Sequence, residues 1–239
     1  MFHLLLTTTS TTLPSGAGGS SININLGNTL SKPSDSILLI ISLALLSLAP
    51  SLLILMTGFT RIIIVFSLLR QALGLSTTPP NQVLSGLALI ISLFIMAPTI
   101  NQVNKIAVQP YLHGKMNATQ AYRAGEVPLK TWMLKQTGNQ ELALTTGVDG
   151  EHPATPTDAS MAAVIPAFML SQLKSGFLIG FIIFIPFLII DLVVASVLMS
   201  MGVVMLPPTL VSLPFKLLLF VMVNGWILVT HSLVVSFHP

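Results

Sequence analysis

Long uncharged hydrophobic segments, separated by short polar ones, are the main pattern along this chain. No Asp, Glu, Lys or Arg occurs in residues 36–60 or 71–104, and after residue 175 only Asp191 and Lys216 carry a charge. A helix that crosses a bilayer needs about 20 apolar residues. The pattern therefore predicts four membrane-spanning helices, at residues 37–58, 83–103, 176–200 and 209–233.

Two proline pairs, Pro79-Pro80 and Pro207-Pro208, separate the predicted helices within each half of the chain. Proline lacks a backbone donor and pushes the preceding residue out of the helical region, so each pair is expected to end a helix and turn the chain back. Further prolines inside the predicted helices predict kinks. We expect an all-α membrane protein with two long, kinked helical hairpins separated by a small helical polar insert. The predicted domains are an N-terminal segment at 1–36, a first helical hairpin at 37–104, the polar insert at 105–174 and a second helical hairpin at 175–239.

The insert is the one predicted domain with the character of a soluble protein, since it holds six basic and five acidic residues. The sequence at residues 117–120 resembles a capping box and predicts a short helix to about residue 124. A second helix is predicted to begin at Pro128 and to end before Gly138. Residues 139–159 contain glycines and prolines and are expected to form a mobile loop.

Residues 1–36 are rich in Ser and Thr and include a Gly-rich run at residues 15–20, which is typical of a flexible segment. The apolar start at residues 1–6 suggests a signal peptide as the alternative. That apolar stretch is short, however, and no Lys or Arg precedes Lys32. A disordered tail is therefore favoured over a degenerate signal peptide, although both readings stay open.

Composition limits the possible functions. Hydrophobic residues make up 53% of the chain and charged residues only 7%, whereas a soluble domain carries about 25% charged residues. Ten basic residues against seven acidic ones are too dilute for a nucleic-acid-binding surface. The chain has no cysteine, its five histidines lack the spacing of metal ligands, and no phosphate-binding or nucleophile motif occurs. We therefore expect no enzymatic activity, no cofactor and no metal.

Orientation in the membrane is predicted from the positive-inside rule. The first connector carries Arg61 and Arg70 and no acidic residue, so both arginines are expected to be topology anchors on the cytoplasmic side. They are nine positions apart, which places them on opposite faces of an ideal helix, so one shared binding site is not expected. The insert and both termini would then face the other side of the membrane.

Two charged residues and two glycines stand out within the apolar helices. An ionised carboxylate is costly inside a membrane, so Asp191 is expected to form a buried charge pair with Lys216. A proton-relay role for Asp191, as in a small-solute channel or secondary transporter, is the alternative. Gly176 and Gly180 form a GxxxG pattern that allows two helix backbones to approach closely, and we expect a helix–helix contact there.

Two long stretches of the sequence resemble the bacterial flagellar biosynthetic protein FliP family. The first, residues 60–87, reads TRIIIVFSLLRQALGLSTTPPNQVLSGL, and the second, residues 180–228, reads GFIIFIPFLIIDLVVASVLMSMGVVMLPPTLVSLPFKLLLFVMVNGWIL. The resemblance covers residues 52–233. The chain departs from the family pattern at its N-terminus, at the methionine run before Pro207, and at Asn224, where many relatives have Asp.

The resemblance implies a pore-forming subunit of the type III export gate in the bacterial inner membrane, with the insert facing the periplasm. It implies a ring of five copies that assembles with FliQ and FliR subunits into a helical pore complex, with FlhB and FlhA as further partners. Unfolded flagellar proteins would be the substrates, and no nucleic acid would bind. The virulence injectisome homologue of the same gate is the alternative within the superfamily. Carried over by position, the residues implied to form a gasket in the pore are Met201, Val203, Val204 and Met205.

Overall fold

The structure, a computed structural model, falls into two compact units, Met1–Leu48 and Ala49–Pro239. The described residues are 43–44, 47, 51, 54–150, 153–203 and 205–237. The predicted N-terminal segment at 1–36 and most of the predicted helix at 37–58 lie outside them. All helices named below belong to the second unit.

The described residues form helices and no strand, which confirms the predicted all-α fold class. The continuous run Asn81–Leu112 comprises α4, η1 and α5, where η1 is a π-helix. The elements are α3 (Phe59–Ala72), α4 (Asn81–Val103), η1 (Asn104–Val108), α5 (Gln109–Leu112), α6 (Ala118–Lys135), α7 (Asn139–Val148), the 3-10 helix η2 (Pro156–Asp158), α8 (Met161–Ser200), α9 (Pro208–Met222) and α10 (Gly225–Val235).

Helix α3 occupies residues that the charge pattern predicts to be a connector. The connector that follows it is short, residues 73–80, and the chain then returns in α4. Four buried apolar residues of α3 recur at the spacing of one helix face. The two arginines near its ends led us to predict a connector, although this apolar face is typical of a packed helix. The residues of the face are Ile62, Val65, Phe66 and Leu69.

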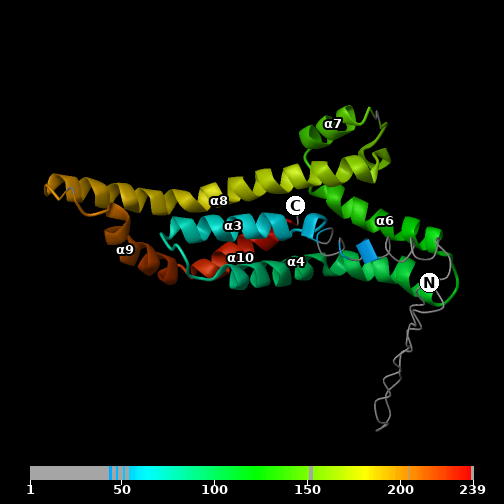
Figure 1. Ribbon diagram of the computed structural model, residues 1–239, viewed down its shortest axis with the longest axis horizontal. Coiled ribbons are helices and arrows are strands. Elements are labelled where there is room, and N and C mark those ends of the chain that lie inside the picture. Colours follow the sequence, from blue (N-terminus) through cyan, green and yellow to red (C-terminus); the bar gives the residue numbers. More distant parts are fainter. Residues whose placement is uncertain are drawn as a thin grey trace, which may run out of the picture. The chain divides into compact units, whose positions relative to one another are not determined.

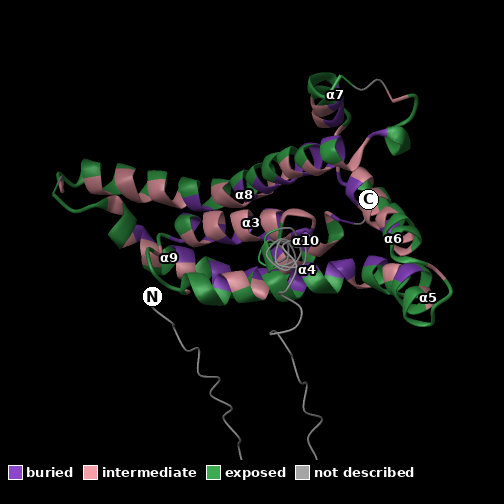
Figure 2. Cartoon of the chain, turned by 45° about the vertical axis from the view of Figure 1, so that its right-hand side comes forward, coloured by how far each residue is buried: buried purple, intermediate pink, exposed green. Residues whose placement is uncertain are grey.

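The main hydrophobic core surrounds α3, which lies between α8 on one side and α4 on the other (Figure 1). Residues from α4 and α10, such as Leu84, Ala88 and Leu233, complete this core. A second core joins the insert to the first part of α8, where Met133 packs with Phe168. Figure 2 shows that exposed residues follow the outer sides of α8 and α4, so much apolar surface of these helices is not covered within one chain.

Glycines end the helices of each hairpin, and the proline pairs begin the next helix. Gly74 and Gly202 follow the ends of α3 and α8 with φ angles of 77° and 73°, the left-handed conformation that glycine adopts without steric cost. Pro80 is the N-cap of α4, and Pro208 is the first residue of α9. The predicted turns are therefore present. The prediction that the proline pairs end the preceding helices was wrong, because α3 and α8 already end at Ala72 and Ser200. Proline instead favours the start of the helix that follows.

The last predicted helix, 209–233, is two helices in the structure. Helices α9 and α10 are bent by 64°, and Asn224 between them has a φ of 50°. Asparagine tolerates this left-handed conformation better than most residues with a side chain. At Gly225 a β-carbon would overlap the ring of Phe220, whose Cζ lies 2.7 Å from the Cβ position. A larger residue at the start of α10 would therefore force the buried Phe220 ring to move.

The insert is more helical than its sequence suggested. The capping box at residues 117–120 is confirmed, but α6 continues through Pro128 as one helix to Lys135. The predicted mobile loop was wrong for its first half, because residues Asn139–Val148 form α7. Helix α8 starts at Met161, where Ser160 caps it by accepting a hydrogen bond from the amide of Ala163. The domain boundaries predicted at 104 and 174 thus fall inside continuous helices and stay predictions.

Two described helices are long and apolar enough to cross a membrane, Asn81–Leu112 and Met161–Ser200, and the bent pair α9–α10 counts as a third if it forms one span. At about 1.5 Å per residue, the 40 residues of α8 extend about 60 Å, roughly twice the thickness of the hydrocarbon layer. Half of α8 therefore extends beyond the hydrocarbon layer when the helix stands upright, and the insert packs on its first part.

Candidate functional site

Asp191 of α8 and Lys216 of α9 form a close ion pair, with 2.6 Å between the Lys216 Nζ and the Asp191 Oδ2 atoms. The Lys216 side chain is only 2% exposed, and its ammonium group also donates to the carbonyl oxygen of Ala72, 3.0 Å away. Ser212, one turn before Lys216, donates from its hydroxyl to the other carboxylate oxygen of Asp191 at 2.5 Å. The cluster therefore joins α8 and α9 to the end of α3.

The groups in this cluster are those expected of a structural contact between helices. Both carboxylate oxygens accept a hydrogen bond, and the ammonium group has a charged and a neutral acceptor, so the polar groups compensate one another at a buried position. Among the described residues no second acid or histidine is hydrogen-bonded to Asp191 or Lys216. The pair was expected from the sequence. Ser212 and the Ala72 carbonyl were not, although a serine four residues before a lysine lies on the same helix face.

The loop between α8 and α9 forms the tip of the second hairpin. Met201 is 70% exposed and Met205 is 97% exposed, whereas Val203 is half-buried. Val204 lies outside the described residues. The amide of Val203 donates to the carbonyl of Leu198, which closes the end of α8 around Gly202. The loop thus has a closed backbone turn from which two methionine side chains extend.

Gly176 and Gly180 lie where α8 packs against α3. A β-carbon at Gly176 would be 3.2 Å from the Cβ atom of Ile64 and 3.4 Å from the Cα atom of Arg61. One at Gly180 would overlap the side chain of Leu68, whose Cβ atom is 3.1 Å away. The small residues of this GxxxG pattern allow the close approach of the two helices within one chain.

The two arginines of α3 lie at its opposite ends. Arg70 donates to the carbonyl of Pro79 and to the side-chain oxygen of Asn81, 3.1 Å and 2.6 Å away, and so holds the turn before α4. Arg61 is 3% exposed and donates to the side chain of Gln136, at the end of α6. Burial lowers the pKa of Arg61 to about 10, in a helix that is not among the candidate spans. A topology anchor is expected to be exposed on the side of the membrane opposite the insert. Arg61 is instead buried and contacts the insert.

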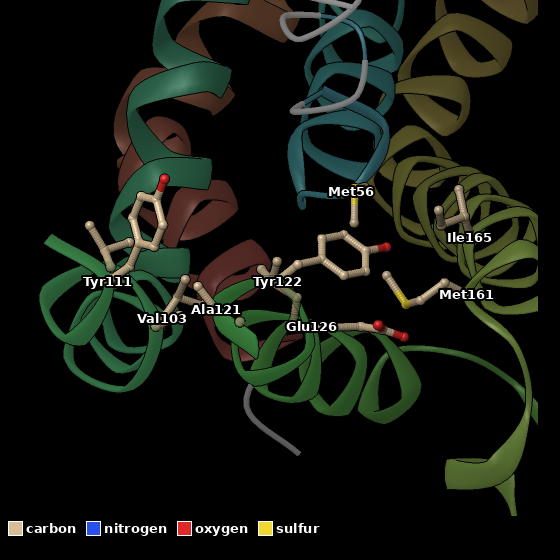
Figure 3. Close-up of a pocket in the computed structure, with 12 residues that line it drawn as sticks. Met56, Val103, Tyr111, Ala121, Tyr122, Glu126, Met161 and Ile165 are labelled. Atoms are coloured by element: carbon tan, nitrogen blue, oxygen red, sulfur yellow. The ribbon is translucent and has the colours of Figure 1, made fainter. Parts of the chain in front are cut away.

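A cavity of about 510 Å³ lies where the insert meets the end of the long helix Asn81–Leu112. Its lining is mainly apolar and includes Tyr111, Tyr122 and one acid, Glu126. In Figure 3 the hydroxyl end of Tyr122 points toward Met161 of α8. A single carboxylate without a described base or metal-ligand group beside it lacks the components of a catalytic site. Within the described ranges no group of three or more His, Cys, Asp or Glu could hold a metal ion.

Fold and polar clusters together define an all-α membrane protein in which buried polar groups connect helices from distant parts of the chain. The particular family follows from comparison. The sequence matches the model of the FliP family over residues 42–233, and the chain belongs to that family.

Several relatives are similar over most of their own length. The flagellar biosynthetic protein FliP of Bacillus subtilis is 49% identical over 217 residues, which cover 90% of this chain and 98% of the relative. The proteins of the same name from Aquifex aeolicus and Caulobacter vibrioides are 48% and 47% identical and cover 85% and 91% of this chain. The alignments cover 86% and 82% of these two relatives. The similarity therefore extends over more than four fifths of both proteins in each case.

Proposed function

We propose that this protein is a pore-forming subunit of the flagellar protein export gate, through which unfolded flagellar proteins cross the bacterial inner membrane. Membership of the FliP family carries the coarser statement, that the chain is a component of the flagellar export apparatus. Relatives named for flagellar biosynthesis favour this branch over the virulence injectisome. The pore and its substrates are the proposal.

The apolar surface of the second hairpin supports assembly with other subunits. A run of large apolar side chains along α8 is more than half exposed in one chain. Because the unbroken α8 is about twice as long as the hydrocarbon layer is thick, lipid alone does not cover an upright helix. We propose that neighbouring copies in a ring of five, with FliQ and FliR subunits, cover it, and that FlhB and FlhA contact the assembled gate. Residues of this surface are Phe177, Leu178, Phe181, Ile182, Ile189 and Leu192.

The tip of the second hairpin is the proposed gasket. Methionine is flexible and polarizable, so a ring of exposed Met201 and Met205 side chains can pack around a passing chain and close again behind it. Val203 and Val204 would complete the seal. Replacing Val203–Met205 by glycine is expected to let small ions leak into the cell while export continues. The same replacement of Ser76–Thr78, in the turn of the first hairpin, is the control, and unchanged ion permeability in the Val203–Met205 variant would contradict the gasket.

The orientation is testable because the chain contains no cysteine. We propose that the insert faces the periplasm and that the 73–80 turn, beside Arg70, faces the cytoplasm. Single cysteines at two exposed positions, Ala154→Cys in the insert and Thr77→Cys in the turn, report this directly. A membrane-impermeant thiol reagent added to spheroplasts should label the first and not the second. The opposite pattern would overturn the orientation.

Deletion of the gene tests the whole proposal. Cells without this protein should retain flagellin inside and should not swim, and the intact gene should restore both properties. Affinity purification of the restored protein from membranes should recover several copies together with FliQ and FliR. Normal flagellin secretion by the deletion strain would refute the export role.

A further inference from the structure

Arg61 lies at the centre of a buried polar network at the insert end of α3. Its Nη1 atom donates to both the carbonyl oxygen and the hydroxyl of Ser236, at 2.9 Å and 3.1 Å. Its Nη2 atom donates to the side-chain oxygen of Gln136 at 3.2 Å. The guanidinium carbon lies 4.0 Å from the centre of the Phe237 ring. One side chain thus contacts the insert and the turn after α10 at the same time.

Gln136 extends the network to two further contacts. Its side-chain nitrogen donates to the carbonyl oxygen of Phe237 at 2.9 Å, and its own backbone oxygen accepts from Gln172 of α8 at 3.3 Å. The ring of Trp132, in the last turns of α6, stacks near Phe237 at a centroid distance of 6.4 Å. Four segments that are distant in sequence therefore meet here: the start of α3, the end of α6, the first third of α8 and the C-terminal turn.

The chemistry of the network is specific for arginine. The two ion pairs of the described residues lie elsewhere, at Lys174–Glu141 and Lys216–Asp191, and the acceptors that Arg61 contacts among these residues are neutral. A planar guanidinium directs several N–H groups at fixed angles and stacks on an aromatic ring, whereas a lysine ammonium is a compact charge on a flexible stem. Lysine at this position could keep one acceptor but could not reach both sides of the network and stack on the ring.

We propose that Arg61 is a positioning residue that fixes the insert and the C-terminal turn to α3, so that α10 and the insert form one rigid base for α8 and α9. This base lies at the N-terminal end of α3. The Asp191–Lys216 pair contacts the other end of the helix, at Ala72. The two polar clusters thus secure opposite ends of the same central helix. The structural part stands without the proposed function; only its consequence for export rests on it.

Hydrogen exchange on the full chain in detergent tests the proposal. Arg61→Ala should raise exchange in residues 133–138 and 228–237 by about tenfold or more, the size expected for losing a charge-assisted hydrogen bond. Arg61→Lys, which can keep one acceptor, should raise exchange by this factor in at least one of the two segments. Exchange near Asp191 should not change. Arg70→Ala, at the other end of the same helix, is the matched control and should leave both segments as protected as in the parent.

A second variant separates positioning from general stability. In Arg61→Lys combined with Gln136→Glu, the new ion pair should restore protection of residues 133–138, while residues 228–237 stay exposed because lysine cannot also hold Ser236. Full protection in Arg61→Lys alone, or a uniform rise in exchange over all helices, would overturn the proposal. Flagellin secretion by the Arg61→Lys strain should fall, and normal secretion would overturn the link to export. Normal secretion by the gene deletion would instead refute the export role and leave the exchange result standing.

Discussion

Removing the carboxylate of Asp191 is expected to be among the most damaging single changes in this protein. Asp191→Asn leaves the Lys216 ammonium group, which is 2% exposed, with the Ala72 carbonyl as its one described acceptor besides the new amide. Breaking a buried ion pair by removing one partner costs about 3–5 kcal/mol. Asp191 itself is 22% exposed, so the pair is not fully enclosed by the protein. We therefore expect a loss of about 3 kcal/mol, or roughly a hundredfold in the folding equilibrium.

The reverse change should be less damaging. Lys216→Met leaves a carboxylate that is partly exposed and still accepts the hydrogen bond from Ser212, so we expect a loss of about 1–3 kcal/mol. Replacing both partners by apolar residues, Asp191→Leu with Lys216→Met, should be close to neutral because no buried charge remains. The unequal losses and the recovery in the double variant form the signature of a structural pair.

Unfolding of the full chain in mixed micelles, followed by tryptophan fluorescence, measures these differences. Glu141→Gln is the control, because its partner Lys174 is 64% exposed and ion pairs in contact with water contribute little. A loss below about 1 kcal/mol in Asp191→Asn would refute the reasoning, and so would a double variant less stable than Asp191→Asn. If Asp191→Asn assembled normally yet stopped export driven by a proton gradient, a proton-relay role would replace the structural one.

Three further outcomes are expected. Gly180→Val should destabilise the chain by about 1–3 kcal/mol through overpacking against α3, whereas Gly86→Ala, which meets open space, should not; chemical unfolding distinguishes them. Asn117→Ala removes the cap of α6 and should cost about 1 kcal/mol, seen as faster amide exchange in the first turn of that helix. The hydrogen bond from Lys174 lowers the pKa of Glu141, so this contact stabilises α7 on α8 above the ordinary carboxyl pKa and is lost as the pH falls through the lowered value. A pH series of amide exchange in α7 should show protection falling only at acidic pH, and constant protection would contradict the contact.

The features predicted best from the sequence are those that follow from the cost of placing charged or apolar groups in the wrong solvent, lipid or water. A lone charge in an apolar helix has few alternatives to a partner, so Asp191 could be paired with Lys216 before the structure was known. The class of fold followed from 17 charged residues, ten basic and seven acidic, in a chain of 239. The capping box at Asn117 was found because its two hydrogen bonds are local.

The features that were missed depend on contacts between distant segments. In the sequence Arg61 and Arg70 indicate exposure and hence a connector at α3, and the approach of Ser236 and Gln136 accounts for a buried arginine there. The break between α9 and α10 had a local signal in Asn224-Gly225, a pair that favours a left-handed turn. It was overlooked because the hydrophobic pattern runs through it without interruption.

The bend at Asn224 restricts where this hairpin can be stable. A helix end leaves up to four carbonyls, and the next helix start up to four amides, without partners inside the helix. In hydrocarbon each such group costs several kcal/mol, so irregular backbone at membrane depth occurs beside protein or water. At the 64° bend the amides of Asn224, Ile227 and Leu228 find acceptors nearby, and α10 packs into the core around α3, so the bend lies beside protein of the same chain. The C-terminal hairpin should therefore keep its bend only while α10 stays packed on this core, which makes its shape depend on long-range contacts and not on its own sequence alone.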